Sequence, residues 1–382
     1  MSPIYLDYNA TAPLLAETWQ KLEPWFLNKF GNAASNTHSL GWQAADAVKQ
    51  AREFFANHIG ASDPSEIYFT SGATEGLNTA LKGIWASYQT KGKHIVSVKT
   101  EHKAVLDTLQ FLETQGADIS LLDVNKNGEI DLQELANAIR KDTIAVCVML
   151  ANNETGVISN LKPIAEIVHQ KDSILVCDAT QALGKIPVNV DELGVDVLVF
   201  SGHKFYAMKG VGGMFVRRKK PRVKLTPLMH GGGHENGLRS GTLNVTGILS
   251  MFYSLQTITT SLAVEMEQQT KLRDYLEEEL KANFDVEIVA HKAARLPNTT
   301  MAIFKNIKAD KLITKMPDFA FSMGSACTSA LPKPSHVLEA MGYSETESAG
   351  AIRVSIGRNT EREDLVKFVE GLKRVMGMLS VV

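Results

Sequence analysis

The sequence has only three cysteines, no long apolar run and almost no net charge. Cys147, Cys177 and Cys327 form no Cys-x-x-Cys pair among the 382 residues, which argues against a disulfide framework. No apolar run reaches the roughly 18 residues that a membrane span requires. The first residues lack the basic segment and apolar core of a secretory signal, and the net charge of -2 argues against nucleic-acid binding. We therefore expect a cytoplasmic protein that contacts neither membrane nor nucleic acid directly.

The length and the apolar pattern predict an α/β fold. A chain of 382 residues exceeds one ordinary hydrophobic core, so we expect two domains. From residue 66 onward strand, turn and helix alternate, which predicts a mainly parallel sheet covered by helices on both faces. The carboxyl ends of such strands meet at one edge of the sheet, where ligands bind. The expected strands are residues 67–69, 95–98, 119–122, 144–148, 174–177, 197–200, 286–289 and 300–304, and the expected helices include residues 14–30, 44–55, 262–284 and a last helix from about residue 363.

A lysine follows the strand at residues 197–200. Lys204 closes the sequence Ser-Gly-His-Lys of residues 201–204, and a glycine-rich turn is expected at residues 210–213. A lysine that is desolvated and close to other cations loses pKa and becomes nucleophilic. Such a lysine can hold a carbonyl cofactor as a Schiff base, and pyridoxal phosphate (PLP) is the commonest one. For this stretch alone, a solvated lysine is the simpler alternative.

Residues after the other strands suit the phosphate group and the pyridine nitrogen of PLP. The turn at residues 71–74 opens a helix and offers backbone N–H groups to a phosphate, which Ser201 and His203 can help to hold. Asp178 directly follows a strand, with Gln181 three residues on, and a buried carboxylate there suits a protonated pyridine nitrogen. A helix cap is the alternative role for the turn and for Asp178.

Two further polar groups complete the expected site. His102 can stack on a flat ring or move a proton, and its alternative is a packed or capping histidine. The amide-rich turn at residues 152–156 can bind a phenolate or carboxylate, or serve only as a polar turn. Lysine, carboxylate, phosphate loop and histidine together favour PLP far more than any one of them does.

Cys327 is a second candidate for chemistry. It lies in a run of mostly small residues, so we expect a partly exposed thiol in a loop at residues 322–334, whereas Cys147 and Cys177 lie in apolar strands as core thiols. An incidental loop cysteine is the alternative. Arg353, on a predicted strand, can clamp a substrate carboxylate, and a surface ion pair is its alternative.

Three motifs point elsewhere. Residues 123–134 fit the twelve-residue calcium loop, but a strand precedes them, and a strand, an Asn-Gly turn and a helix from about Asp131 explain them equally well. The basic run at residues 217–224 suits an acidic partner, or more simply a solvated hairpin. His230 and His234 flank three glycines without other ligands, so we expect no metal site.

The ordered set of motifs resembles the cysteine desulfurases. These are fold-type I PLP enzymes of the class V aminotransferase family, and the match is closest to the group I (NifS/IscS-like) branch. The resemblance spans nearly the whole chain. Its motifs are residues 5–11, 70–75, 100–102, 151–156, 201–204, 239–242 and 324–329.

The resemblance implies a role for each candidate residue. Lys204 carries PLP, Cys327 takes the sulfur, and Asn153 and Arg353 orient the substrate carboxylate. A homodimer is implied because Thr242 reaches the phosphate in the other subunit. His102 lies on the cofactor ring, where it also serves as acid or base for the substrate thiol. The remaining cofactor contacts are Asn153, Asp178 on the ring nitrogen, Gln181 on the ring hydroxyl, and Ala73, Thr74, Ser201 and His203 on the phosphate.

The resemblance also implies an activity and a domain division. L-cysteine becomes L-alanine, and the sulfur stays on Cys327 as a persulfide that passes to an iron–sulfur scaffold or a tRNA-thiolating enzyme. Residues 14–255 form the large PLP-binding domain, and residues 1–13 join residues 256–382 in a small domain. The alternatives are a class V aminotransferase, a selenocysteine lyase or a non-catalytic sulfur-transfer scaffold.

The chain departs from the family pattern at four places. Ala207-Met208 replaces the usual Gly-Pro, Ala33-Ala34 replaces Pro-Ser, and Cys177 precedes the aspartate. Longer relatives continue beyond the position of Val382 into a tail that helps to dock the scaffold. None of these departures removes a catalytic group.

Overall fold

The computed structural model describes residues 3–219, 221–305, 307–323 and 335–379. Cys327 lies outside the described residues, as does most of its predicted loop at residues 322–334. Among the helices of the described part, none is long and apolar enough to cross a membrane.

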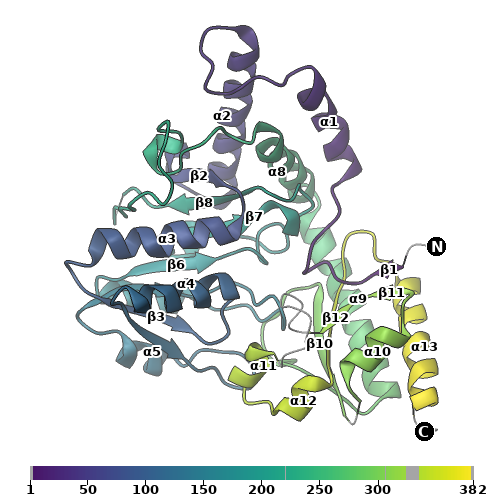
Figure 1. The fold of residues 1–382 in the computed structure, drawn as a ribbon. Helices are drawn as coiled ribbons and strands as arrows, with labels where there is room; N and C mark the ends of the chain where they lie inside the picture. The colour runs from purple at the N-terminus through teal and green to yellow at the C-terminus, as the bar shows by residue number, and fades with distance from the viewer. Residues whose placement is uncertain (1–2, 220, 306, 324–334, 380–382) are drawn as a thin grey trace.

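A seven-stranded sheet forms the centre of the larger part of the molecule (Figure 1). Its strand order is β2-β8-β7-β6-β5-β3-β4, and all neighbours pair in parallel except β8, which runs antiparallel to β2 and β7. The expected mainly parallel α/β sheet is therefore confirmed. The strands are β2 (Ile67–Thr70), β3 (His94–Val98), β4 (Asp118–Leu122), β5 (Thr143–Cys147), β6 (Ile174–Asp178), β7 (Val197–Ser201) and β8 (Gly212–Val216).

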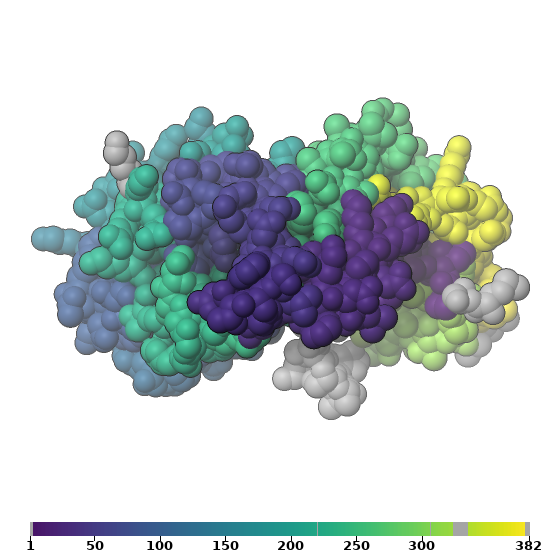
Figure 2. Space-filling view, turned by 90° about the horizontal axis from the view of Figure 1, so that it is seen from above, coloured from purple at the N-terminus to yellow at the C-terminus, as the bar shows by residue number. Residues whose placement is uncertain are grey.

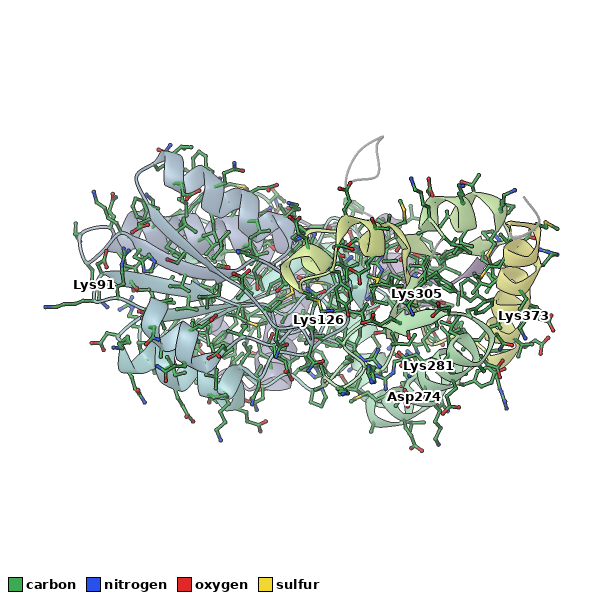
Figure 3. The ribbon with its side chains drawn as sticks, turned by 90° about the horizontal axis from the view of Figure 1, so that it is seen from below. Lys91, Lys126, Asp274, Lys281, Lys305 and Lys373 are labelled. Carbon is green, nitrogen blue, oxygen red and sulfur yellow. The ribbon has the colours of Figure 1, made fainter. Side chains whose placement is uncertain are left out.

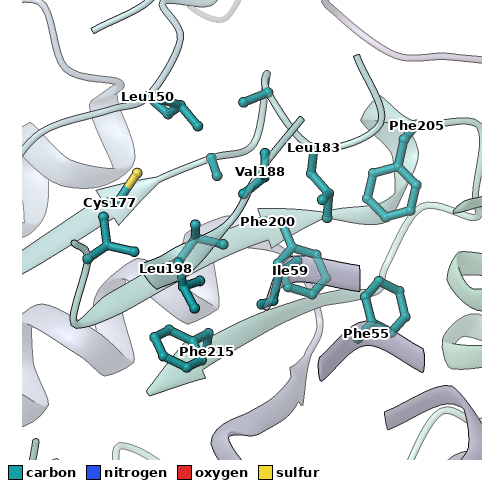
Figure 4. Close-up of a cluster of buried hydrophobic side chains, with 14 of the residues drawn as sticks. Phe55, Ile59, Leu150, Cys177, Leu183, Val188, Leu198, Phe200, Phe205 and Phe215 are labelled. Carbon is teal, nitrogen blue, oxygen red and sulfur yellow. The ribbon is translucent and has the colours of Figure 1, made fainter. Parts of the chain in front are cut away.

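Helices bury both faces of this sheet. Along β7, Leu198 and Phe200 join one hydrophobic cluster and Val197 and Val199 the other, because successive side chains point to opposite faces. Figure 4 shows Phe200 next to Phe55 of α2, and Leu198 near Phe215 in the same cluster. Helices α3 and α4 cover one face, and α2, α6 and α8 cover the other. The helices of this part are α1 (Ala16–Leu27), α2 (Ser39–Ile59), α3 (Ala73–Tyr88), α4 (Lys103–Thr114), α5 (Leu132–Ala138), α6 (Leu161–Gln170), α7 (Val190–Leu193) and α8 (Val245–Thr259).

The glycine-rich stretch after Lys204 differs from the prediction. Only its beginning turns, and strand β8 starts at Gly212. A Cβ on Gly212 would lie 2.6 Å from the Cα of Gly72 and 2.6 Å from the carbonyl oxygen of Phe200. Glycine is needed there because β8 passes directly against the turn that opens α3.

A second, four-stranded sheet lies in the C-terminal part. Its order is β12-β13-β10-β9, and all its pairings are antiparallel. It packs on its own hydrophobic cluster, which includes Phe304, Ile352 and Phe368. The elements of this part are β1 (Ile4–Tyr5), α9 (Leu262–Asn283), β9 (Val286–Ile288), β10 (Thr299–Phe304), α10 (Ala309–Lys315), β11 (Phe319–Ala320), β12 (Ser322–Met323), α11 (His336–Ala340), α12 (Glu345–Ala349), β13 (Ala351–Ser355) and α13 (Arg362–Leu379).

The N-terminal segment joins the two parts. Strand β1 pairs in parallel with β11, and the backbone N–H of Ser355 donates to the carbonyl oxygen of Leu6 at 2.8 Å. Figure 2 shows the N-terminal residues crossing the middle of one face, and Figure 3 places Lys91 and Lys373 at opposite ends of the molecule. We propose the division into residues 14–255 and residues 1–13 with 256–382, supported by the separate sheets and cores.

Candidate active site

A cavity of about 610 Å³ lies at the carboxyl edge of the seven-stranded sheet. A volume of this size suits a small-molecule cofactor together with a substrate. Thr242 is exposed and does not line the cavity, and Cys327 lies outside the described residues. The predicted site residues that do line it are Ala73, Thr74, His102, Asn153, Asp178, Gln181, Ser201, His203, Lys204 and Arg353.

Lys204 lies in a 3-10 turn directly after β7. Its Nζ donates to the carbonyl oxygens of Asn9 and Ala10, both at 2.7 Å. The next residue, Phe205, is fully buried in the core and fixes the backbone of this turn. The ammonium group is thus directed toward the N-terminal segment that forms one wall of the cavity.

The replacement of Gly-Pro by Ala207-Met208 leaves this turn well bonded. The backbone N–H of Ala207 donates to the carbonyl oxygen of Gly202 at 3.1 Å, and the N–H of Met208 donates to Oγ of Ser250 at 3.1 Å. A proline in place of Met208 would lack that second donor.

The N-terminus of α3 provides the expected phosphate cradle. Helix α3 packs so closely on β7 that a Cβ on Gly76 would lie 2.6 Å from Cγ1 of Val199. The N-cap, Gly72, supplies no side-chain cap, so the first N–H groups of the helix remain available to a ligand. Ala73 and Thr74 of this turn and Ser201 at the end of β7 all line the cavity. The arrangement suits a phosphate monoester.

Asp178 and Thr180 offer buried polar atoms toward the cavity. Asp178 is buried at the end of β6, and its Oδ1 accepts the backbone N–H of Thr180 at 2.9 Å. Within the described residues no cation pairs with this carboxylate, and the buried Oγ1 of Thr180 has no hydrogen-bond partner. A buried carboxylate is costly without a partner, so a protonated pyridine nitrogen fits this position. The residues present therefore fit PLP.

Both histidines of the cavity favour the neutral form. Burial, assisted by Lys204 and opposed by Asp178, lowers the pKa of His102. Burial, assisted by Lys204 and Lys209, lowers the pKa of His203 to about 4. Nδ1 of His102 accepts the backbone N–H of Ala104 at 3.1 Å, so His102 also caps α4. A neutral imidazole that accepts at Nδ1 carries its proton on Nε2 and can donate it from there.

Arg353 is held by two acceptors. It is 2% exposed on β13, and its Nη2 lies 2.6 Å from Oδ1 of Asp7. Its Nη1 donates to the carbonyl oxygen of Asn153 at 2.9 Å. Its buried Nε has no partner among the described residues. The alternative of a surface ion pair is therefore wrong, because Arg353 is buried and Asp7 is mostly buried.

Asn9, which is not among the predicted site residues, connects many of these groups. Besides Lys204, its carbonyl oxygen accepts Nε2 of Gln181 at 2.9 Å. Its side-chain Nδ2 donates to the carbonyl oxygen of Asn153 at 3.2 Å and to Oγ1 of Thr299 at 2.9 Å. Asn9 falls inside one of the resembling motifs, but no local pattern predicts contacts across 172 or 290 residues.

The calcium-like motif and the two cysteines have structural explanations. Asp131 caps α5 by accepting the N–H groups of Gln133 and Glu134, and Oδ1 of Asn125 accepts those of Asn127 and Glu129. The strand–turn–helix alternative is thus confirmed. Cys147 and Cys177 are fully buried, and burial raises the pKa of both thiols.

The two remaining motifs are equally ordinary. Arg217 is not solvated as expected for the basic run: its Nη1 lies 2.7 Å from Oδ1 of Asp191, and its Nη2 donates to the carbonyl oxygen of Val195. In the part of the chain that the structure describes, no group of three or more His, Cys, Asp or Glu side chains, His230 and His234 included, is arranged to hold a metal.

Comparisons with known proteins agree with this geometry. Residues 4–368 match the family model described as aminotransferase class-V. The chain is 44% identical over 378 residues to a cysteine desulfurase IscS of Neisseria meningitidis, covering 99% of this chain and 93% of the relative. A solved structure titled NifS-like protein superposes with a TM-score of 0.91 at 33% identity, covering 98% of this chain and all of the other.

A further solved structure carries a ligand in its title. It is named SspA in complex with cysteine, and it matches with a TM-score of 0.82 at 33% identity over 92% of this chain and 98% of that one. Family match, near-complete coverage and identity together place the chain: it belongs to the class V aminotransferase family and, within it, to the IscS/NifS-like cysteine desulfurases, which depend on PLP.

Proposed function

We propose that this chain converts L-cysteine to L-alanine with PLP and keeps the sulfur as a persulfide on Cys327. The observation that carries the proposal is the cavity itself, where Lys204, Asp178, His102 and Arg353 meet the open N-terminus of α3 in a chain of this family.

The residues to which we give a cofactor contact all line the cavity, apart from Thr242. Lys204 would hold the aldehyde, Asp178 the ring nitrogen and Gln181 the ring hydroxyl, and His102 would stack on the ring. The phosphate would lie at the start of α3, against Ala73, Thr74, Ser201 and His203. When bound, PLP supplies an electron sink that makes the Cα proton of an amino acid removable.

The substrate carboxylate would lie between Arg353 and Asn153. Asp7 and the carbonyl oxygen of Asn153 already fix the guanidinium plane, and the Nε–H, which has no partner among the described residues, is left to donate. Binding of the carboxylate fixes the orientation of Cα. Nζ of Lys204 then takes the Cα proton as a general base and can return it.

The sulfur transfer needs a nucleophile and a proton donor. The thiolate of Cys327 attacks the substrate sulfur, so an S–S bond forms while the Cβ–S bond breaks. The electron pair of the broken bond stays with Cβ, which gains a proton and becomes the methyl group of alanine. His102, neutral with its proton on Nε2, is placed to exchange the proton of the substrate thiol.

A homodimer is part of the proposal. Thr242 is exposed and does not line the cavity of its own chain, which supports a role at the phosphate in a second subunit. The ion pair between Arg239 and Glu75, with Nε 2.7 Å from Oε1, links the segment that carries Thr242 to the start of α3. Light scattering on purified protein tests the dimer, and Thr242→Ala should weaken PLP binding without changing the subunit count.

The sulfur acceptor is proposed by class only. An iron–sulfur scaffold or a tRNA-thiolating enzyme would accept the persulfide sulfur from Cys327. A cytoplasmic location follows from the prediction of reduced thiols, and the buried, unpaired Cys147 and Cys177 support it. Cell fractionation tests the location.

The deciding experiment follows sulfide and alanine together in purified protein given L-cysteine and a reductant. Equal amounts of both products, lost in Cys327→Ala, are expected. A yellow PLP protein that releases neither product but exchanges amino groups with a keto acid would replace desulfuration by aminotransfer. A colourless protein would favour the non-catalytic scaffold.

A further inference from the structure

A second lysine is buried beside Lys204, and the proposed reaction gives it no task. Lys185 is 9% exposed and lies in the turn after β6, four residues beyond Gln181. Its Nζ donates to Oε1 of Gln181 at 2.5 Å and to Oδ1 of Asn9 at 2.8 Å. Both acceptors belong to residues whose other atoms contact the cavity.

The surroundings of Lys185 do not favour an ammonium group. Within the described residues no carboxylate pairs with it. Burial, assisted by Lys204 and Arg353, lowers its pKa well below the ordinary value. Folding stability alone does not explain a buried lysine without a counter-ion, because an apolar side chain of similar volume would avoid the desolvation cost.

The charged and titratable groups around Lys185 come from several elements. A hollow of about 10 Å³, the size of one water molecule, lies beside it, and Glu265 in its wall is already paired with Arg358 at 3.1 Å. Lys204 and Arg353 are the remaining charged groups near it. The titratable residues that line this hollow are Tyr8, Lys185, Lys204, Tyr206 and Glu265.

Lys185 decides how the Gln181 amide is oriented. An amide has one accepting end and one donating end, whereas lysine only donates. Gln181 must therefore turn Oε1 toward Lys185, and its Nε2 then faces the carbonyl oxygen of Asn9 at 2.9 Å. Asn9 is turned in the same way by Lys185, and Asn298 adds a second donor to its Oδ1 at 3.2 Å.

The fixed amides also determine where Lys204 rests. The carbonyl oxygen of Asn9 accepts both Nε2 of Gln181 and Nζ of Lys204. A flipped Gln181 would turn its oxygen toward that carbonyl oxygen, and the two acceptors would repel each other. Lys185 thus acts on the site through contacts and not by touching the reacting atoms.

We propose that Lys185 is a positioning residue: its Nζ donates to Oε1 of Gln181 and so fixes the amide with Nε2 toward the carbonyl oxygen of Asn9, and its positive charge lies beside Lys204. The proposal rests on the proposed function for the role of the cofactor. The orientation of the Gln181 amide and the positive charge beside Lys204 are expected to affect different measured quantities.

Lys185→Met tests both parts because it keeps the side-chain length and removes donor and charge. The apparent Kd for PLP, measured by fluorescence on apo-protein, should rise about tenfold. Gln181→Ala should raise it by a similar factor, and the double variant should show no further increase, because both changes remove the same contact. The pH midpoint of the absorbance change of bound PLP should rise by about one unit, because a cation that opposed protonation is gone.

Lys185→Gln separates the two parts. Its amide can donate to Oε1 of Gln181 without a charge, so the PLP affinity should recover while the raised midpoint stays. If Lys185→Met does not fold, Lys185→Gln still tests the effect of removing the charge. Lys271→Met, at an exposed pair with Glu267, is the matched control and should change neither quantity. The melting temperature of apo-protein should not fall in Lys185→Met.

The proposal needs both the non-additivity with Gln181 and the upward midpoint. Independent, additive effects on the PLP affinity would overturn it, as would an unchanged midpoint. A lowered melting temperature with an unchanged midpoint would make Lys185 purely structural. If wild-type protein forms no alanine from L-cysteine, the proposed function fails, yet the PLP affinity and the midpoint still decide the role of Lys185.

Discussion

Two cavities of nearly equal volume are lined mostly by residues of the larger part of the molecule, and they differ in whether their buried polar groups already have hydrogen-bond partners. The active-site cavity holds about 610 Å³, and the other, at the calcium-like motif between Asp123 and Glu134, about 600 Å³. In the second cavity Asp123 lies 2.7 Å from Nζ of Lys99, and Asp131 already caps α5. In the first, the buried Oγ1 of Thr180 and Nε of Arg353 have no partner among the described residues. Volume alone does not mark the site; unsatisfied buried polar groups do.

The strongest test of this comparison is Lys204→Ala. Without the amine, the cavity has no covalent anchor for PLP and no base at Cα, so we expect alanine formation to fall by more than about 1,000-fold. Coupled assay of alanine from L-cysteine measures it. The melting temperature of apo-protein should change little, and retention of a tenth of the activity would refute the role given to Lys204.

Arg353→Met should damage both binding and stability. The change leaves Asp7, whose side chain is 17% exposed, without its partner, so the free energy of unfolding should fall by about 3 kcal/mol. The KM for L-cysteine should rise at least about tenfold, since the carboxylate loses its cation. Urea unfolding and initial rates measure the two effects.

The matched control for Arg353→Met is Lys305→Met. Lys305 and Asp285 are 2.8 Å apart, close to the 2.6 Å between Arg353 and Asp7, but their side chains are 59% and 69% exposed. Breaking that pair should cost no more than about 0.5 kcal/mol. Equal losses from the two variants would show that burial does not distinguish these pairs.

The pH dependence of stability should carry opposite signs at the two histidines His203 and His169. The pKa of His203 is lowered to about 4 in the folded chain, so between about pH 6.5 and pH 4 the unfolded state binds more protons, and the stability of the fold decreases as the pH falls. The hydrogen bond that His169 donates to the Asp196 carboxylate raises the pKa of His169, so its contribution to stability is present at low pH and is lost as pH rises through the folded pKa. Urea unfolding at pH 7.5 and 5 should show a smaller loss in His203→Gln and a larger one in His169→Gln.

The smallest effect is expected at the second cavity. Asp131→Ala removes the cap of α5, which should cost about 1 kcal/mol of unfolding free energy and leave kcat unchanged. Millimolar calcium should move the melting temperature by less than about 1 °C, because the cap and the Lys99 pair already use these carboxylates. A clear calcium-dependent rise would turn the second cavity into a cation site and end the contrast.

The strands and the polar residues after them could be predicted because their signals are local. Strands buried on both faces appear as continuous apolar runs, and parallel strands end at one edge, so Asp178 and Lys204 were expected together. The predicted turn at residues 210–213 is wrong for its second half, where β8 begins at Gly212, since Gly212 is required by a close contact with Gly72 that no local pattern records. Helix α8 was not expected either, because the pattern loosens after residue 225.

The contacts that hold the site together could not be predicted for the same reason. Asp7 meets Arg353 across 346 residues, and Asn9 meets Lys204 across 195. Nothing in the local sequence distinguishes Lys185 from a solvated lysine in a turn. Its burial and its contacts with Gln181 and Asn9 appear only in the folded structure. Such contacts depend on how two distant parts of the chain pack.

The N-terminal segment also makes completion of the active site depend on the order of protein synthesis. Residues 4–12 leave the ribosome first, but their partners in β11 and β13 are made more than 300 residues later. At about 5–20 residues per second, that interval is roughly 20–70 s. Until then Asp7 lacks its partner Arg353 and Asn9 lacks its partner Thr299. The carbonyl oxygen of Asn9, which accepts Nζ of Lys204, is therefore not yet held in place. A nascent chain can therefore complete the large sheet well before it can complete the site, and a chain interrupted before β13 would keep the fold of that sheet without the chemistry.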